Sequence, residues 1–578
     1  MKTTKNIARL AVTAGLTAAL SFGGVMAPVT MAFAAGATTA NGSVTIENVE
    51  DNTTEFEGYQ IFKADVATNG TVSNITWANN NVQHAVESFI QSEDESYEGT
   101  TAQDAADWIT KKVEGTGKTT RVEFGSIPYK IADRVDGLTA SATTTNKTVS
   151  GLEHGYWLFV TKADTIGVGE AGTSPIFTVV GDTPVEVNEK TGIPTVEKKV
   201  LDDSKVTGCA ITGEEEANWK DAADSQIGQE VNYKLIGTIA DNYASYDSYS
   251  YKFKDTLEEG LDFVDDSLSV YALNGDAYTE IAPASYGVTK PSDSSRDLIV
   301  DFSKGEKGLK SATAKNGGTL TINANTKIVV FYKAKLNAKA VIAGANNKLE
   351  GNPNTVTLEY SNNPMVAGTG TSVPDTVVDY TYGLQINKVD LGTEAALEGA
   401  QFTITTTGDG NNKVAKYVAN DGTLSDDEVV LTTNAKGLIQ LTGLDAGTYT
   451  VTEKKAPNGY NAVSSFDFTI TPTITEEGQV YKLTKLDGTL DPKGQGGKVI
   501  AGLTDGKSGD NNLEAATGTT TNADGTFNIT VGDTKQVGLP LTGLNGVTFT
   551  WIAGGAVLCI GVVHLIRSRK QAEESEQE

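Results

Sequence analysis

Two lysines occupy positions where alternating apolar residues predict the buried face of a β-strand. Lys198 lies between Val196 and Val200, and Lys388 follows Ile386 on the same face. Burial of an ammonium group is costly because the charge loses its hydration. Such a lysine either reaches solvent from a short edge strand or belongs to a reaction that removes its charge.

Carboxyl and amide groups interrupt apolar strand faces in the same parts of the chain. The positions concerned are Asp255, Asn354, Glu453 and Asp533. Loss of water lowers the pKa of a buried lysine and raises the pKa of a buried acid, so both groups can be neutral. A neutral amine is a nucleophile, and a protonated acid can bind the target carbonyl and carry the proton. This pattern favours an intramolecular isopeptide bond, whose formation releases ammonia from Asn or water from Asp.

The C-terminus carries a short motif, an apolar run and a basic cluster, in this order. The motif consists of Leu539, Pro540, Leu541, Thr542 and Gly543. The run from Val547 to Ile566 would be about 30 Å long as a transmembrane helix, and the charged tail at 567–578 would stay in the cytoplasm. This order looks like the cell-wall sorting signal of Gram-positive surface proteins, cut by a sortase between Thr542 and Gly543. The alternative is an ordinary single-pass anchor with a chance motif.

The N-terminus has the pattern of a secretory signal peptide over residues 1–34. Basic residues precede the apolar stretch Leu10–Val29, and Ala32-Phe33-Ala34 has the small-residue pattern of a cleavage site. We therefore expect an exported protein whose mature chain begins at Ala35.

Composition excludes several classes of function. The net charge of −28 argues against a nucleic-acid partner. Of the two cysteines, Cys559 lies in the apolar run, so Cys209 has no partner for an internal disulfide. The chain has three histidines and neither G-x-S-x-G nor H-E-x-x-H, so we expect no metal, no cofactor and no exported enzyme.

The first domain, 35–189, is expected to combine strands with one or two helical insertions. Phe56–Phe62 and Gly155–Val160 have strand composition. Apolar residues recur at helical spacing over Val82–Ile90, and a capping-box pattern at Thr101 predicts a second helix.

Two all-β domains, 195–375 and 380–535, follow a linker at 190–194. Short alternating strands separated by turn signals favour immunoglobulin-like β-sandwiches. Lys198 lies on the first strand of the middle domain, and Asn354 lies on the strand predicted to close it.

Residues 449–460 resemble the E-box, Y-x-x-x-E-x-x-A-P-x-G-Y, of collagen-adhesin B-type domains. With the LPLTG motif and the lysine linker, the chain is similar to the backbone pilins of sortase-assembled Gram-positive pili. The resemblance covers the mature chain from the linker onward, and 36–189 more loosely. It implies tandem immunoglobulin-like domains of collagen-adhesin A and B type.

The resemblance also implies roles for individual residues. In the middle domain Lys198 would bond to Asn354 with Asp255 as the acid. In the third domain Lys388 would bond near the end of the domain, with Glu453 as the acid. The expected closing Asn is Asp533 here, so this bond would be Lys–Asp; Asn528 is the fallback, although it belongs to the opposite strand face.

Between subunits, the resemblance implies a bond from Thr542 to Lys190 of the next subunit. The usual Tyr-Pro-Lys-Asn of the family is Asn188-Glu189-Lys190-Thr191 in this chain. Lys199 and Lys205 therefore stay open as alternative acceptors.

The predicted function is that of a structural subunit of a covalent cell-surface pilus that supports adhesion. The expected partners are further copies of the chain, a sortase, peptidoglycan, minor tip or basal pilins and host surface ligands. The expected location is the Gram-positive cell wall, after a transient membrane tether. The alternative is a monomeric wall-anchored adhesin that binds a host matrix protein or glycan and does not need Lys190.

Overall fold

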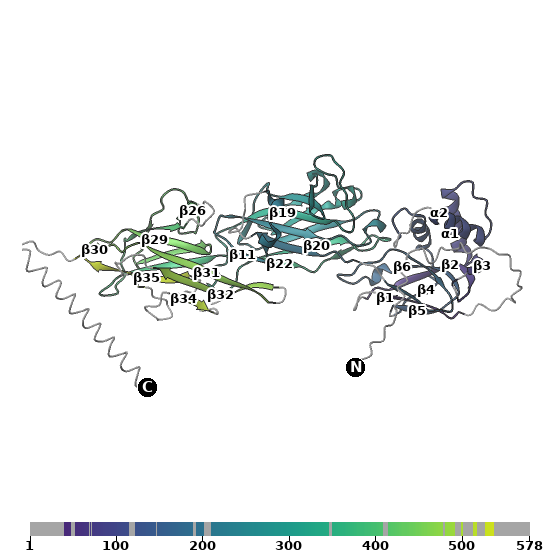
Figure 1. Cartoon of the computed structure of the whole chain (residues 1–578), viewed down its shortest axis with the longest axis horizontal. Coiled ribbons are helices and arrows are strands. Elements are labelled where there is room, and N and C mark those ends of the chain that lie inside the picture. Colours follow the sequence, from purple (N-terminus) through teal and green to yellow (C-terminus); the bar gives the residue numbers. More distant parts are fainter. Residues whose placement is uncertain are drawn as a thin grey trace, which may run out of the picture.

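The computed structural model is a rod in which three mainly β domains follow one another (Figure 1). It describes residues 40–47, 53–68, 70, 72–114, 122–145, 147–188, 192–201, 210–345, 349–407, 414–477, 480–491, 499–500, 512–516 and 526–536. Lys190, Lys205, the LPLTG motif, the predicted signal peptide and the predicted transmembrane helix lie outside these residues. Within them, none of the helices has the length and apolar character needed to span a bilayer.

The first domain packs three helices against a β-sheet. The larger sheet has the order β3-β2-β6-β7 with β4 beside β2, and a smaller sheet has the order β5-β1-β8. The strands are β1 (Gly42–Glu47), β2 (Phe56–Val66), β3 (Val72–Trp77), β4 (Ala142–Thr143), β5 (Thr148–Leu152), β6 (Gly155–Thr161), β7 (Ile176–Val180) and β8 (Val185–Asn188). The helices are α1 (Asn80–Glu93), α2 (Ala102–Glu114) and α3 (Ile127–Val135).

The two predicted helices of this domain are confirmed, and a third was not predicted. The capping box of α2 forms, because the Asp104 carboxylate accepts hydrogen bonds from Thr101 N at 2.9 Å and Thr101 Oγ1 at 2.7 Å. The expectation of one or two helices was wrong because the domain has three. α3 has only 9 residues, too few for a clear helical periodicity, and its start signals are Ser126 as N-cap and Pro128 in the first turn.

The middle domain is a sandwich of two sheets. One sheet has the order β10-β9-β12-β19-β15-β16 with β14 beside β19; the other has the order β11-β22-β20-β13-β18-β17 with β21 beside β20. The first sheet contains β9 (Val196–Leu201), β10 (Trp219–Lys220), β12 (Glu230–Gly237), β14 (Leu261–Phe263), β15 (Ser269–Asn274), β16 (Ala277–Glu280) and β19 (Lys327–Leu336). The second contains β11 (Ala222–Asp224), β13 (Tyr251–Leu257), β17 (Gly287–Thr289), β18 (Asp297–Asp301), β20 (Asn352–Ser361), β21 (Thr369–Thr371) and β22 (Asp375–Tyr380).

The strand that carries Asn354 does not close this domain, and that prediction was wrong. After β20 the chain forms β21 and then β22, which pairs with β20 on one side and β11 on the other. Val377 of β22 is fully buried in the common core of the two sheets. The sheet therefore continues to Tyr380, past the predicted boundary at 375.

The third domain is a second sandwich with no α-helix among its described residues. One sheet has the order β28-β23-β35-β30 with β33 beside β35; the other has the order β26-β25-β24-β29-β31-β32-β34 with β27 beside β24. The first contains β23 (Tyr382–Asp390), β28 (Leu438–Leu444), β30 (Tyr460–Asn461), β33 (Val499–Ile500) and β35 (Thr526–Lys535). The second contains β24 (Gln401–Thr406), β25 (Tyr417–Val418), β26 (Leu424–Ser425), β27 (Leu431–Thr432), β29 (Gly447–Lys455), β31 (Phe466–Glu477), β32 (Val480–Asp491) and β34 (Asn512–Ala516).

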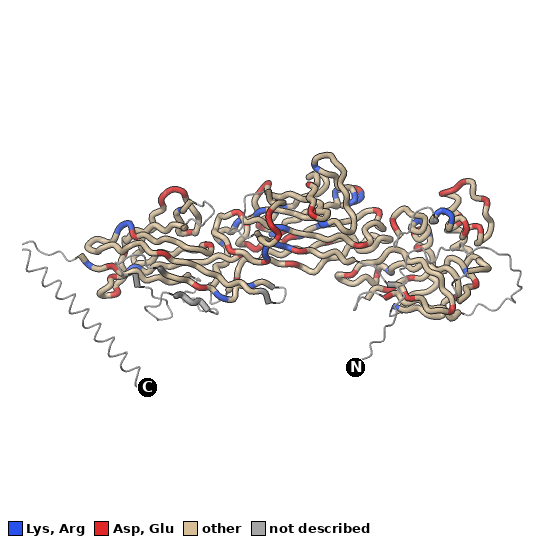
Figure 2. The backbone as a smooth tube through the Cα atoms, viewed as in Figure 1, with Lys and Arg blue, Asp and Glu red and all other residues tan. Residues whose placement is uncertain are grey.

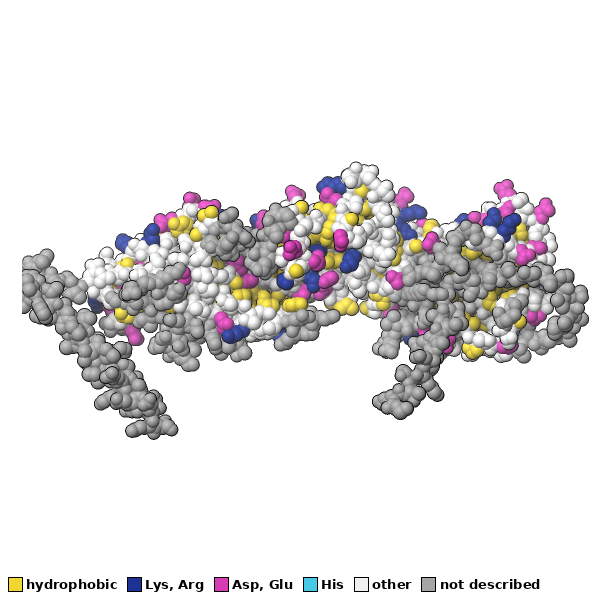
Figure 3. Space-filling view, viewed as in Figure 1, with side chains coloured by type: hydrophobic (Ala, Val, Ile, Leu, Met, Phe, Trp, Pro, Cys, Tyr) yellow, Lys and Arg dark blue, Asp and Glu magenta, His cyan; other side chains and the backbone are white. Residues whose placement is uncertain are grey.

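Hydrogen bonds join the domains along the rod. Between the first two, Asn242 Nδ2 donates to Gly172 O at 2.9 Å and Tyr129 OH donates to Pro364 O at 3.1 Å. Between the last two, Ile227 N donates to Gly443 O at 2.9 Å. Basic and acidic residues are interspersed along all three domains (Figure 2), and the visible face mixes charged side chains with small apolar groups (Figure 3).

Candidate functional site: two buried lysine clusters

The middle domain holds Lys198 in a cluster that is sealed from solvent. Lys198 lies on β9 in one sheet, and Asp255 lies on β13 in the other. Their side chains are fully buried and meet across the core, where Lys198 Nζ donates a hydrogen bond to Asp255 Oδ1. The edge-strand reading, in which the lysine reaches solvent, is therefore wrong.

Tyr332 of β19 links the other groups of this cluster. Its hydroxyl accepts a hydrogen bond from Lys198 Nζ at 3.1 Å and donates one to Asp255 Oδ2 at 2.6 Å. Asn354 of β20 donates from Nδ2 to the same hydroxyl at 2.6 Å. The structure thus brings the three predicted residues together around a fourth.

The carbonyl of Asn354 has no partner among the described residues. Oδ1 is buried and makes no hydrogen bond there. A buried acceptor without a partner costs free energy and calls for an explanation. An amide that is poised to react, rather than one that serves as a permanent hydrogen-bonding group, supplies such an explanation.

Burial changes the ionisation of this cluster. It lowers the pKa of Lys198 to about 8, although the neighbouring Asp255 carboxylate acts in the opposite direction. Burial likewise raises the pKa of Asp255 above its ordinary value. Both shifts favour transfer of a proton from the lysine to the acid, which leaves a neutral amine.

The third domain contains a second cluster around Lys388. This lysine and Asp533 come from the adjacent parallel strands β23 and β35, and Glu453 comes from β29 in the facing sheet. Lys388 Nζ contacts Asp533 Oδ1 and lies 2.9 Å from Glu453 Oε1, and all three side chains are fully buried.

The two carboxyls of this cluster differ in their other contacts. Glu453 Oε2 accepts a hydrogen bond from Val463 N at 2.8 Å. Asp533 Oδ2 has no hydrogen-bond partner among the described residues. Burial, reinforced by the nearby Glu453, raises the pKa of Asp533 to about 6 even though Lys388 opposes the shift. The cluster therefore places two carboxyls beside one amine, with the raised pKa on Asp533.

Asn528 does not join this cluster. As the strand pattern predicts, it belongs to the other face of β35, and its Oδ1 accepts hydrogen bonds from Asn387 and, at 3.1 Å, from Gln385 Nε2. Lys199 is also engaged elsewhere, since its Nζ lies 2.6 Å from Asp221 Oδ1 and 2.9 Å from Glu197 Oε1.

Tyr332 is the residue that sequence reasoning missed. A signal exists, because Val330, Tyr332 and Ala334 share one face of β19 and all are buried. A hydroxyl within an apolar row requires a buried partner. The row was not related to the lysine because β19 lies far from β9 in the sequence.

The two tyrosines of the E-box bind the chain just before β29 and at the end of β23. Tyr449 OH donates to Asp445 O at 2.8 Å, and Tyr460 OH donates to Asp390 Oδ2 at 2.7 Å. Gly459 has φ +86°, a turn conformation that favours glycine. Only Glu453 of the motif lies in the lysine cluster.

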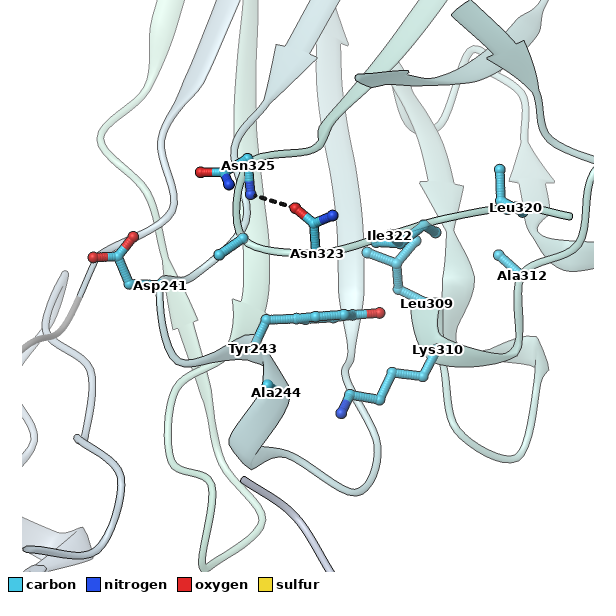
Figure 4. A pocket seen from close by; sticks show the side chains of 11 residues that line it. Asp241, Tyr243, Ala244, Leu309, Lys310, Ala312, Leu320, Ile322, Asn323 and Asn325 are labelled. Atoms are coloured by element: carbon cyan, nitrogen blue, oxygen red, sulfur yellow. Dashed lines mark hydrogen bonds between the residues drawn. The ribbon is translucent and has the colours of Figure 1, made fainter. Parts of the chain in front are cut away.

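A surface pocket of the middle domain lies apart from both clusters (Figure 4). Its lining includes Tyr243, Lys310, Asn323 and Asn325. Lys310 Nζ lies over the Tyr243 ring at 4.9 Å and donates to Tyr246 O, which gives this lysine a packing role. Across the described residues, no group of metal-ligating side chains occurs that could hold an ion.

Residues 383–489 match the family described as "SpaA: Prealbumin-like fold domain". The match contains Lys388 and Glu453 and ends before β35, which carries Asp533. It therefore covers β23 and β29, the strands of Lys388 and Glu453.

A curated relative aligns with part of the chain. The "Trypsin-resistant surface T6 protein" of Streptococcus pyogenes serotype M6 is 32% identical over 145 residues, which cover 23% of this chain and 23% of that protein. The chain thus spans less than a quarter of the length of this relative.

Solved structures of pilins are similar at low sequence identity. The T6 backbone pilin of serotype M6 Streptococcus pyogenes is 18% identical with a TM-score of 0.47, covering 87% of this chain and 99% of that one. The major pilin SpaD of Corynebacterium diphtheriae is 16% identical with a TM-score of 0.43, covering 86% and 97%.

Proposed function

We propose that this chain is a structural subunit of a covalent surface fibre, the backbone pilin of a Gram-positive pilus. The observation that carries the proposal is the pair of solvent-free clusters in which a lysine contacts a carboxyl, one in each sandwich. The partial match to a streptococcal surface protein supports it. An isopeptide bond accounts for the clusters, because it removes charges that are costly to bury.

In the middle domain, Lys198 passes a proton to Asp255, and the neutral amine attacks Cγ of Asn354. The bond from Cγ to Nδ2 breaks and ammonia leaves. Fixed positions in a dry core supply much of the rate, since the reacting groups need no further ordering. The loop closed between residues 198 and 354 would contribute roughly 5 kcal/mol on the chain-entropy estimate used for disulfides.

In the third domain, Lys388 attacks Cγ of Asp533 and water leaves. An ammonium gives up two protons when it becomes an amide nitrogen. One passes to Asp533, which turns its oxygen into a hydroxyl that can leave, and Glu453 takes the other and returns it to the departing oxygen. The bond would join adjacent parallel strands, β23 and β35, near the point where the domain ends.

Between subunits, a sortase would cut after Thr542 and transfer its carbonyl to Lys190 of another copy. The helix expected at 547–566 is then a temporary membrane tether, discarded at cleavage. The final subunit would be passed to peptidoglycan, while minor pilins and host ligands would bind the finished fibre.

Wall extracts on denaturing gels test this function. The parent chain should give a ladder of high-mass species that resists boiling in detergent, and Lys190→Ala should reduce it to monomer that is still attached to the wall. Lys199→Ala and Lys205→Ala serve as matched controls and should keep the ladder. A parent chain that runs only as monomer would overturn the proposal in favour of a monomeric adhesin.

A further inference from the structure

The hydroxyl of Tyr332 contacts every other polar group of the middle-domain cluster. Lys198 Nζ lies 3.1 Å from it, Asn354 Nδ2 lies 2.6 Å from it, and Asp255 Oδ2 lies 2.6 Å from it. It is therefore in hydrogen-bond contact with the nucleophilic nitrogen, the departing nitrogen and the acid. Tyr332 is 1% exposed, so solvent does not reach this hydroxyl to transfer a proton.

Formation of the proposed bond requires a proton to move between two nitrogens. A neutral lysine amine has two protons, and the product amide keeps one. The departing nitrogen of Asn354 has two and must leave as ammonia with three. One proton must therefore travel from Lys198 Nζ to Asn354 Nδ2 inside a core without water.

We propose that Tyr332 is a catalytic residue that relays this proton. Its oxygen accepts the proton of the attacking nitrogen as its own hydroxyl proton passes to the departing nitrogen. The Cγ–Nζ bond forms, the Cγ–Nδ2 bond breaks, ammonia leaves, and the tyrosine returns to its starting state. This inference rests on the proposed isopeptide chemistry and assigns the relay that it needs.

The geometry favours Tyr332 over Asp255 as the donor to the leaving group. Asp255 makes no hydrogen bond to Asn354 in the described structure, whereas the Tyr332 oxygen lies 2.6 Å from Asn354 Nδ2. The Tyr332 hydroxyl donates to Asp255 Oδ2 before the reaction, and it can turn to the departing nitrogen once Lys198 has neutralised this carboxyl. Asp255 therefore takes the first proton from the lysine, which makes the amine nucleophilic. Burial raises the pKa of Tyr332 well above its ordinary value, so its hydroxyl is protonated when the relay begins.

A neighbouring tyrosine provides a matched control. The ring of Tyr233 stacks on that of Tyr332 with centroids 5.2 Å apart, and it is equally buried. Its hydroxyl donates instead to Asp379 Oδ2 at 3.3 Å. Tyr332→Phe therefore removes a hydroxyl from inside the cluster, and Tyr233→Phe removes one from the same core outside the cluster.

The test follows bond formation in newly made full-length chain. Cells receive a pulse of isotope-labelled amino acids, and digests at successive times give the ratio of cross-linked to linear peptides around Lys198 and Asn354. General acid–base catalysis contributes roughly a hundredfold to ten-thousandfold in rate, so Tyr332→Phe should slow the bond at least tenfold. Tyr233→Phe should match the parent, and the Lys388–Asp533 peptide in the same digests should be unaffected.

The outcomes test the relay by Tyr332 separately from the formation of the Lys198–Asn354 bond. A parent chain without the Lys198–Asn354 cross-link refutes the proposed isopeptide chemistry of the middle domain, whereas the gel ladder tests the pilus function separately. A parent with the cross-link and a Tyr332→Phe variant of equal rate refutes only the relay. Because removal of the hydroxyl could disturb folding, 3-fluorotyrosine at position 332 keeps the group and changes its acidity. The relay predicts an altered rate for that protein, and an unaltered rate contradicts it.

Discussion

Each buried lysine is held by a carboxyl that the fold has removed from water, but the two carboxyls are placed differently. Asp255 lies on a strand next to the strand of the target Asn354, with Leu257 opposite that amide. Glu453 approaches from the facing sheet, while the target Asp533 neighbours the lysine in the same sheet. The same chemistry is thus proposed for two different arrangements of strands.

Removal of either acid should prevent the bond of its own domain only. Once the change of mass from the substitution itself is allowed for, Asp255→Asn should be heavier than the parent by one ammonia and Glu453→Gln by one water, as intact mass will show. Acids outside both clusters serve as controls: Asp297→Asn and Glu428→Gln should have the fully condensed mass. If Glu453→Gln still loses water, the role of the E-box acid is wrong.

When the middle-domain bond cannot form, the pH dependence of the stability of this domain should reveal the free-energy cost of burying Lys198. In Asn354→Ala the lysine stays, and its pKa of about 8 in the fold lies below the ordinary value of 10.5. The unfolded chain binds more protons between these values, so the stability of this domain should rise as the pH increases from about 8 to about 10.

The control for this pH effect is Lys198→Met combined with Asn354→Ala. It lacks the titrating group, so the difference in unfolding temperature between the two variants should shrink over the same pH interval. Scanning calorimetry of the transition that Asn354→Ala shifts gives the measurement. A constant difference would show that the lysine is not desolvated.

At the level of elements, the strand that carries Lys388 is fixed by a close contact with the loop before β28. Gly437 has φ +72°, its carbonyl accepts a hydrogen bond from Lys388 N at 2.7 Å, and an added Cβ would lie 2.5 Å from Lys388 O. Gly399 has a similar φ of +83°, but an added Cβ there would meet no atom within 4 Å.

A comparison of alanine substitutions at Gly399 and Gly437 separates the free-energy cost of backbone strain from the cost of displacing β23. In a Glu453→Gln background, Gly399→Ala should cost roughly 1–2 kcal/mol for the left-handed conformation. Gly437→Ala should cost about 1–3 kcal/mol more, because β23 must move. Hydrogen exchange of the β23 and β28 amides reports the local opening free energy. Equal costs at both positions would contradict the contact.

The sequence was informative where a strand has one buried and one polar face. Val196, Lys198 and Val200 revealed a face that the structure buries, and the alternation correctly separated Asn528 from the face of Asp533. Which strands face one another is a matter of long-range pairing, which alternation does not encode. For that reason the alternation predicts neither the contact of Tyr332 with Lys198 nor the strands that follow Asn354.

At the scale of the whole molecule, the proposed bonds determine which segments carry tension. Load that enters at Lys190 would reach Lys198, cross to Asn354 and continue through β20 and β22 into the third domain. There it would cross from Lys388 to Asp533 close to the exit. The first domain would stay outside this path, although hydrogen bonds attach it to the middle domain.

Stretching a single molecule between Lys190 and Thr542 should reveal this path. With the bond formed, only residues 355–380 of the middle domain can extend, at most about 90 Å. In Asp255→Asn the segment between 198 and 354 is also released, which adds about 500 Å. Asp297→Asn should behave as the parent, and a long extension of the parent would contradict the bond.

The presence of Asp533 where the related pattern has Asn makes the two proposed bonds unequal in their reversibility. Both links would be the same amide between a lysine Nζ and a Cγ carbonyl, so water that entered either core could hydrolyse them. Hydrolysis in the middle domain would leave an aspartate at position 354 in place of the asparagine that reacted. Hydrolysis in the third domain would return Asp533 itself, so the link between β23 and β35 could form again once water had left the core.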